Sequence, residues 1–314
     1  MTTAAQRAVA RRHYRDSRRV TLAAVRSAIR AWRGLDPGAP QRSWVRDGIG
    51  EQLLRTAVAG KLAAAQQAAP YLDEYLAVVE GPPASPARLV PRSLVTEAAD
   101  GRELDQLLRQ PMISALVAAD RGALIADAYR AGELALARIM ANEVANTGRV
   151  ADQIEMATRP AVAGYIRLLT PPSCGRCVIL AGRFYRWNAD FERHPNCDCT
   201  AIPTTEAPES EELVDPSAAV RAGQVRGLSR ADERAILEGA DPGQVINAHS
   251  GMYTTDGVKF TRAGTTRRGF AAARFRQVTG RRISQRLRPE AIFQIAGDDR
   301  DEALRLLHLH GYLL

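Results

Sequence analysis

The chain has 314 residues and a mass of 34.2 kDa, which is enough for two or three packed units with hydrophobic cores. Its 46% hydrophobic and 25% charged residues are typical of soluble proteins, and no apolar stretch of about 18 residues predicts a membrane span. The N-terminus lacks the apolar run of a secretion signal, so we expect a cytosolic protein, in which clustered cysteines indicate a metal or catalysis rather than disulfides.

The net charge of +8 is unevenly distributed. Residues 1–33 contain nine Arg and one Asp, for a net +8, and residues 257–288 contain ten basic and no acidic residues, for a net +10. Residues 34–256 between them carry 22 basic and 29 acidic residues, for a net −7. Basic blocks attract polyanions through counterion release, without sequence specificity. The alternative is that the arginines only solvate long helices.

Residues 4–34 predict one long helix, because they are good helix formers without an internal Gly or Pro, and the segment GLDPGAP then provides a stop. One face carries arginines in its first half: Arg7, Arg11, Arg15 and Arg18. The same face carries apolar residues in its second half: Leu22, Val25, Ile29 and Trp32. We expect the apolar half to pack and the arginine half to contact water or phosphate.

Further helices are predicted toward the middle of the chain. Helical character resumes over 43–79, and the segment GPPASPARLVP at 81–91 predicts an extended linker. Pro111 is expected to end a helix that covers 103–110. An Ala- and Leu-rich run over 112–145 then predicts another long helix, most of whose apolar residues belong to a core.

The pattern changes near residue 160. The segments GYIRLLT and GRFYRW are short and rich in aromatic and β-branched residues, so they predict two strands on either side of a turn that holds the first cysteines. Residues 202–216 are acidic, contain Pro and lack periodicity, which predicts a surface connection. A smaller unit follows, with a helix over 229–239 and a strong two-residue hairpin signal at Asp256-Gly257. Two short helices are expected at the end, the first opened by Pro289 and the second ended by Gly311.

All four cysteines lie within residues 171–199, as a Cys-x2-Cys pair followed by His-Pro-x-Cys-x-Cys. Five candidate ligands compete for the four positions of a tetrahedral zinc site: Cys174, Cys177, His194, Cys197 and Cys199. We favour the four cysteines as ligands. His194 would either replace one of them or contact one of the ligands without itself binding the metal. The short spacing of Cys197 and Cys199 is a reason for one of them to be left out.

Other chemistries fit the cysteines less well. Four buried reduced thiols are one alternative, and a pair of disulfides is a weaker one. A redox Cys-x-x-Cys normally begins a helix after a strand in a βαβ unit, whereas the flanking segments here predict a hairpin. The deaminase pattern requires a His-x-Glu, which the sequence lacks, and phosphate-loop, nucleophile-elbow and His-Glu-x-x-His motifs are absent too. We therefore expect no enzymatic activity.

The segments SCGRC, LAGRFYRW and RHPNCDC follow a long helical region in this order. In this arrangement, which covers about residues 100–205, the sequence resembles the MuF-like minor capsid, or head morphogenesis, proteins of tailed bacteriophages. The segments GTTRRGFAAARFRQ and RLRPEAIFQIAGDDRDEALRLLHLHGYL are similar to the tail of MuF-like proteins from phages of actinobacteria.

The resemblance implies a structural virion component. Such a protein is made in the host cytoplasm and lies in the head interior or at the portal vertex in few copies. Its implied partners are the portal or other head proteins, and its Arg-rich ends imply non-specific contact with packaged DNA. No membrane and no small-molecule substrate are implied. Some family members carry C-terminal toxin domains, but we recognise no catalytic set of residues in this chain.

The sequence thus predicts a mainly α fold, with a long-helix N-terminal body, a small metal-stapled β-hairpin and a small α+β C-terminal unit. We expect a helical arm region at 1–90 and a helical MuF-like core with the Cys/His metal hairpin at 91–201. An acidic linker at 202–216 and a C-terminal unit with a basic segment at 217–314 complete the chain. Structural Zn²⁺ is the expected cofactor. The alternative functions are a zinc-containing enzyme and a nucleic-acid-binding protein.

Overall fold

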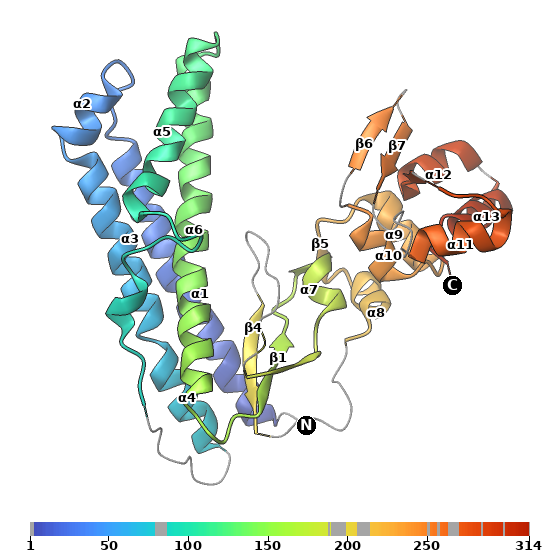
Figure 1. The fold of residues 1–314 in the computed structure, drawn as a ribbon, viewed down its shortest axis with the longest axis horizontal. Helices are drawn as coiled ribbons and strands as arrows, with labels where there is room; N and C mark the ends of the chain where they lie inside the picture. Colours follow the sequence, from blue (N-terminus) through green and yellow to red (C-terminus); the bar gives the residue numbers. More distant parts are fainter. Residues whose placement is uncertain are drawn as a thin grey trace. The chain divides into compact units, whose positions relative to one another are not determined.

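The structure, a computed structural model, describes residues 3–78, 87–187, 189, 199–205, 214–249, 252–255, 258–262, 270–283, 285–297 and 299–313. Helix makes up 63% of it and strand 10%, so the predicted mainly α fold class is confirmed (Figure 1). The chain forms two compact units, one of residues 1–168 and 184–211 and one of residues 169–183 and 212–314. Among the described helices, none is long and apolar enough to cross a membrane.

The first unit is mainly a helical bundle. Its helices are α1 (Ala4–Trp32), α2 (Pro40–Val45), α3 (Ile49–Ala65), α4 (Ala68–Ala77), α5 (Leu104–Asp120) and α6 (Ile125–Ala157), with a 3-10 turn η1 (Pro91–Leu94). The single long N-terminal helix is confirmed, and a capping box formed by Thr3 and Gln6 fixes its start. The long helix α6 packs against α1, α3, α4 and α5, and the bundle core lies between these helices.

Pro111 does not end a helix, so that expectation was wrong. Helix α5 continues through Pro111 to Asp120, and the chain turns only at residues 121–124, where Gly122 has a φ of +93°. A proline inside a helix costs about 3 kcal/mol, mainly through a missing hydrogen bond and a clash with the preceding turn. Leu108 and Met112 are buried on either side of it, and their packing outweighs this local cost.

The packed face of α1 also differs from the expected one. Leu22, the first residue of the predicted apolar stripe, is 42% exposed, whereas Ala24 and Ala28 are buried against the bundle. Val25 and Trp32 of the same stripe pack on the core as expected. Small residues allow close approach of the helices: a Cβ added at Gly60 of α3 would lie 3.0 Å from the Cβ of Ala24. The helix is therefore held by a row of alanines and by Trp32, and the large apolar side chain at position 22 shares the outer face with the arginines.

Two glycines of α6 provide a matched test of this packing. A Cβ at Gly132 would lie 2.5 Å from Cζ2 of the buried Trp32 indole, while a Cβ at Gly148 would lie 3.5 Å from Ala64. Replacing a helix-interior Gly with Ala gains about 1 kcal/mol in propensity, and overpacking costs about 1–3 kcal/mol. We expect Gly148→Ala to stabilise the bundle and Gly132→Ala to destabilise it by about 1 kcal/mol. Denaturant unfolding followed by tryptophan fluorescence measures both, and equal gains would contradict the packing around Trp32.

A three-stranded sheet completes the first unit, in the order β3-β1-β4. It consists of β1 (Gly164–Leu168), β3 (Phe184–Arg186) and β4 (Thr200–Thr204), all antiparallel neighbours. The predicted pairing of the two segments that flank the first cysteines is confirmed, with Tyr165 opposite Tyr185. Strand β4 was not expected, and it includes the first three residues of the predicted 202–216 linker. Residues 206–213 of that stretch lie outside the described residues.

The second unit contains short elements. They are β2 (Ser173–Cys174), α7 (Gly175–Ile179), α8 (Pro216–Arg221), β5 (Val225–Arg226), α9 (Arg230–Leu237), α10 (Pro242–Asn247), β6 (Met252–Thr255), β7 (Val258–Thr261), α11 (Phe270–Thr279), β8 (Arg286–Leu287), α12 (Pro289–Ala296) and α13 (Arg300–Leu309). The predicted helices near 229–239 and at the C-terminal end are confirmed. Asp256 and Gly257 lie outside the described residues, but Thr255 and Val258 on either side are paired in register.

The two units differ from the predicted ranges. The expected arm region at 1–90 and the helices α5 and α6 of the expected core at 91–201 lie in one unit. The sequence indicated a C-terminal unit that begins after the acidic stretch, whereas the second unit also includes residues 169–183. Parallel pairing of β2 with β5 places this segment there, with Ser173 opposite Val225. The first unit is accordingly interrupted between β1 and β3.

Candidate functional site

Cys174 and Cys177 lie together at the start of α7. Cys174 ends β2 and is the N-cap residue of the helix, and the backbone N–H of Cys177 donates to its Sγ at 3.4 Å. The Cys177 side chain is fully buried, and Cys174 is half-buried. The thiolate is the form of cysteine that binds metal. The structure thus brings together the two members of the Cys-x2-Cys pair.

The local sequence explains this geometry. The backbone N–H of Ser173 donates to the carbonyl oxygen of Gln224 at 2.9 Å, which holds β2 beside β5. Gly175 then allows α7 to approach α10, since an added Cβ would lie 3.1 Å from the Ile246 side chain. The cysteines occupy a strand followed by a short helix rather than a hairpin turn. The sequence argued against a redox pair because a hairpin was predicted here. That argument no longer applies.

Of the other three candidate ligands, the structure describes only Cys199. Cys199 is buried directly before β4, in the first unit, while Cys174 and Cys177 belong to the second. His194 and Cys197 lie outside the described residues. Over the described ranges, no cluster of three or more His, Cys, Asp or Glu side chains is placed to hold a metal ion.

Comparison with known proteins gives no further assignment. No family model, no curated protein and no solved structure matches this chain. The chemistry of the candidate site is therefore argued from its own residues and their surroundings.

Buried ionic groups in the bundle are a feature that the sequence did not indicate. The ammonium group of Lys61 on α3 lies 3.0 Å from Oε2 of Glu143 on α6, and both side chains are buried. Lys61 also donates to the carbonyl oxygen of Glu97, and the N–H of Ala99 donates to Glu143 at 3.0 Å. This pair anchors the segment before α5 to the centre of the bundle.

His13 also has a partner that the sequence did not reveal. Its Nε2 lies 2.9 Å from Oδ2 of Asp152 on α6, and its ring stacks on Tyr71 with the centroids 4.0 Å apart. Burial lowers the pKa of His13, but the charge and hydrogen bond of Asp152 outweigh it, and the net pKa is raised above 6.5. The Tyr71 hydroxyl donates to the carbonyl oxygen of Ala201 at 3.1 Å, so this cluster ties β4 to the helices.

A third buried cluster lies near the end of α6. Glu155 accepts from the guanidinium of Arg159 at 3.0 Å and from the backbone N–H of Leu89 at 2.8 Å. Both charged side chains are nearly inaccessible, and Arg159 also reaches Asp73 on α4 at 3.0 Å. The buried acidic groups of α6 are thus engaged inside the packed bundle, which indicates a structural role.

The second unit has a comparable cluster around Asp232, which is fully buried. Nη2 of Arg288 lies 3.1 and 3.0 Å from its two carboxylate oxygens, and Nε2 of His249 lies 2.8 Å from Oδ2. Ser229 donates to the same oxygen from its hydroxyl at 2.9 Å. These contacts join α9 to the residue that precedes α12.

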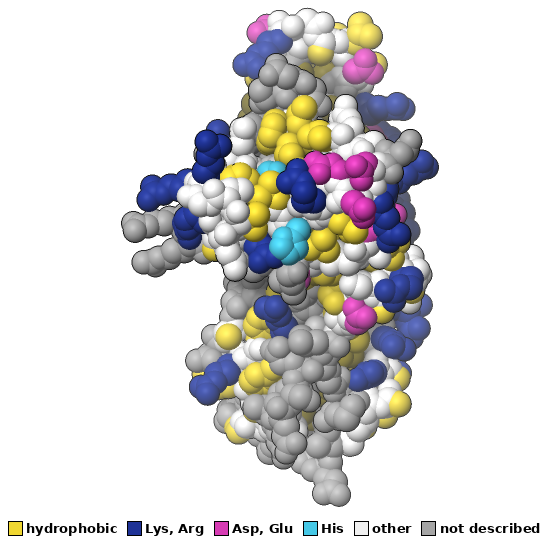
Figure 2. Space-filling model, turned by 90° about the vertical axis from the view of Figure 1, so that its right-hand side faces the viewer, with side chains coloured by type: hydrophobic (Ala, Val, Ile, Leu, Met, Phe, Trp, Pro, Cys, Tyr) yellow, Lys and Arg dark blue, Asp and Glu magenta, His cyan; other side chains and the backbone are white. Residues whose placement is uncertain are grey.

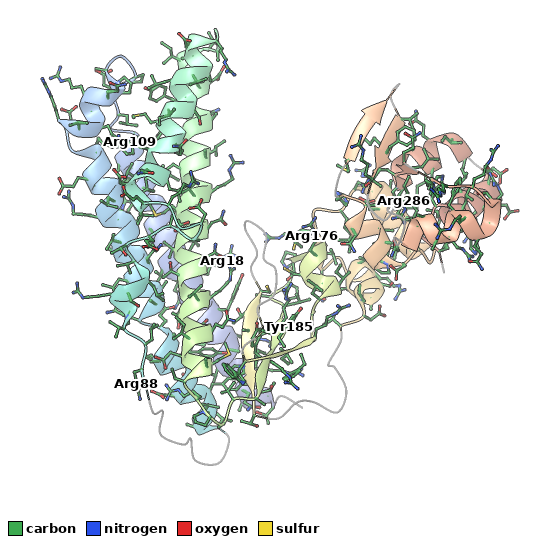
Figure 3. All side chains as sticks on the ribbon, viewed as in Figure 1. Arg18, Arg88, Arg109, Arg176, Tyr185 and Arg286 are labelled. Carbon is green, nitrogen blue, oxygen red and sulfur yellow. The ribbon has the colours of Figure 1, made fainter. Side chains whose placement is uncertain are left out.

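The basic block at 257–288 is divided between core and surface. Arg286, labelled in Figure 3, belongs to the second unit. It is 1% exposed, donates to the carbonyl oxygens of His310 and Gly311, and stacks over Tyr312. Arg286 and Arg288 are therefore core residues, and the expectation of a continuous polyanion-binding block was wrong for these two positions. Figure 2 shows Lys and Arg side chains scattered over the face that it draws, with Asp and Glu side chains among them.

The N-terminal basic block is exposed throughout its outer face. The packed residues of α1 lie on one side of the helix, and on the other side its arginines are exposed: Arg11, Arg12, Arg15, Arg18, Arg19, Arg26, Arg30 and Arg33, the last being the C-cap residue. This face is the second candidate site, since guanidinium groups are suited to phosphate and carboxylate ligands.

Proposed function

We propose that this protein is a structural minor head protein of a tailed bacteriophage, of the MuF-like type found in phages of actinobacteria. The observation that supports it best is the order of features along the chain. The 33-residue helix α6 leads into β1, the Cys-x2-Cys pair, the strand β3 and then the His-Pro-x-Cys-x-Cys segment. This is the order on which the resemblance to MuF-like proteins rests. The protein would act in head morphogenesis, at the portal or the inner capsid.

We also propose that the cysteines hold a structural zinc ion. Cys174 and Cys177 fit the role because both sulfurs belong to one short turn and one of them accepts a backbone N–H. The remaining ligands would come from His194, Cys197 and Cys199. A zinc ion bound in this way supplies folding energy and keeps no open coordination position.

The main alternative is a zinc-containing enzyme, and the observation in its favour is that Cys174 begins a helix after a strand. A catalytic zinc keeps one position open for water or substrate, whereas a structural zinc has four protein ligands. The spectrum of cobalt-substituted protein distinguishes the two. Four thiolate or imidazole ligands would support the structural site, and a bound water would support the enzyme.

Quantitative mass spectrometry of purified phage particles tests the head-protein proposal. We expect the protein in particles at a few copies each, made in the host cytoplasm before assembly. Hundreds of copies would indicate a coat protein instead. Complete absence from particles that assemble in cells producing the protein would contradict the proposal, and this outcome does not depend on the zinc.

A further inference from the structure

We propose that the outer face of α1 binds the phosphate backbone of double-stranded DNA. The proposal deepens the proposed function, on which it rests for the identity of the DNA as the packaged genome. Helix α1 buries only one side against the bundle, through Gln6, Val9, Ala10, His13, Ala24, Ala28, Ala31 and Trp32. The opposite side is available to a ligand over nearly the whole length of the helix.

Seven of the nine arginines of this helix and its C-cap fall into two groups, while Arg7 is half-buried and Arg30 donates to the Ser27 hydroxyl at 2.9 Å. Three of them are matched by a carboxylate of the protein itself: Arg12 by Glu74, Arg19 by Asp16 at 2.8 Å, and Arg33 by Glu133 at 2.9 Å. Asp16 is the single acidic residue of α1. These three arginines have their charge balanced within the fold.

The second group keeps its charge unbalanced. Arg11, Arg15 and Arg26 are exposed, and within the described parts of the chain they make no ion pair and no hydrogen bond. Arg18, labelled in Figure 3, is exposed and donates to the neutral hydroxyl of Tyr14 at 3.2 Å. Four guanidinium groups on one helix face are therefore available to an anionic ligand.

The spacing of this second group suits a polymer of phosphates better than a single anion. From Arg11 to Arg26 the helix rises about 22 Å, at about 1.5 Å per residue. Duplex DNA carries one phosphate charge per about 1.7 Å of its axis, so a straight face of this length meets several phosphates. Arginine also binds phosphate through two parallel N–H bonds, which fixes orientation without reading sequence.

The rest of the face argues against two other ligands, an apolar protein surface and a single-stranded nucleic acid. Protein interfaces have an apolar core, and Leu22 is the only exposed large hydrophobic residue of α1. Single-stranded nucleic acids are bound by exposed aromatic side chains that stack on the bases. Trp32 is buried and Tyr14 is half-buried, so this face offers charge without a stacking platform. The composition therefore favours the backbone of a duplex.

The experiment compares two triple variants of the full-length protein. The test variant is Arg11→Gln, Arg15→Gln and Arg26→Gln, and the matched control is Arg12→Gln, Arg19→Gln and Arg33→Gln. Both remove three positive charges from the same helix, but the control removes arginines that are already paired. Fluorescence anisotropy with a random-sequence duplex of about 30 base pairs, over a range of salt concentrations, gives the slope of log K against log salt.

We expect the slope of the test variant to shrink by about 0.9 for each phosphate that is no longer bound, and thus by about 2.7 for three phosphates. The control should change it by less than about 1. Equal changes in both variants would show an effect of net charge alone and would overturn the proposal. An unchanged slope, together with weaker binding to an acidic head protein, would overturn it in favour of a protein partner. Presence of the wild-type protein in particles would leave the proposed function standing in either case.

Discussion

Replacing Cys174 with serine is expected to abolish zinc binding and to unfold the segment around α7. Structural zinc supplies on the order of 10 kcal/mol of local folding free energy, and serine does not replace a thiolate ligand. Serine is, however, a good N-cap residue, so it preserves the hydrogen bond that Cys174 accepts from Cys177 at the start of the helix. The substitution therefore separates the role of the metal from that of the cap.

Two measurements decide this prediction. Elemental analysis should find about one zinc per chain in the wild type and none in the Cys174→Ser variant. Amide hydrogen exchange should show loss of protection in α7, and a chelator should reproduce that loss in the wild type but add nothing to the variant. A metal-free wild type, or a Cys174→Ser variant with undiminished protection, would show that these cysteines act only as packed thiols.

Replacing Arg288 with methionine is expected to destabilise the second unit by about 3–5 kcal/mol. Methionine keeps most of the aliphatic stem but leaves Asp232, which is fully buried, without its main compensating charge. Arg305→Met is the matched control, because Arg305 pairs with Glu302 at the surface with its side chain 60% exposed. Exposed pairs of this kind contribute less than about 1 kcal/mol.

The pH dependence of the same variant provides a second check. Burial raises the pKa of Asp232, but the hydrogen bond from His249 and the charge of Arg288 act against it, and the net pKa lies below 3.8. A carboxylate with a lowered pKa contributes stability above its unfolded pKa and loses it as the pH falls through the folded value. The difference between wild type and Arg288→Met should thus be full at neutral pH and shrink below about pH 4. A constant difference down to about pH 2 would contradict the charge argument.

Helices with clear local signals were predictable from the sequence. Helix α9 begins at a capping box of Ser229 and Asp232, and α12 begins at Pro289, so short-range chemistry sets these boundaries. The predicted helix end at Pro111 was wrong because the free-energy cost of a proline is a local effect, whereas the packing that offsets it comes from other helices. The predicted packing face of α1 was partly wrong for a similar reason. Trp32 packs in the core as expected, but close helix approach places Ala24 and Ala28 in the contact and leaves Leu22 exposed.

The candidate site was predictable only in its residue types. The spacing of Cys174 and Cys177 identified the pair, but β2 pairs with a strand about fifty residues away, at Val225 and Arg226, which no local pattern indicates. The buried acids of α6 have no sequence signal either, since Glu143 and Asp152 look like ordinary surface residues of a long helix. Their partners come from α3 and α1 and are identified only once the bundle is assembled.

The interleaving of the two units sets an order for synthesis on the ribosome. The bundle helices α1 to α6 emerge first and contain most of the packing partners that they need. Residues 169–183 emerge next, but β2 and α7 belong with β5 and α10, which are made later. This segment must therefore wait, exposed, until the C-terminal part of the chain has been translated. A gene fragment that starts at residue 217 lacks β2, the partner of β5, and one that stops at residue 211 lacks β5 and α10, against which β2 and α7 pack.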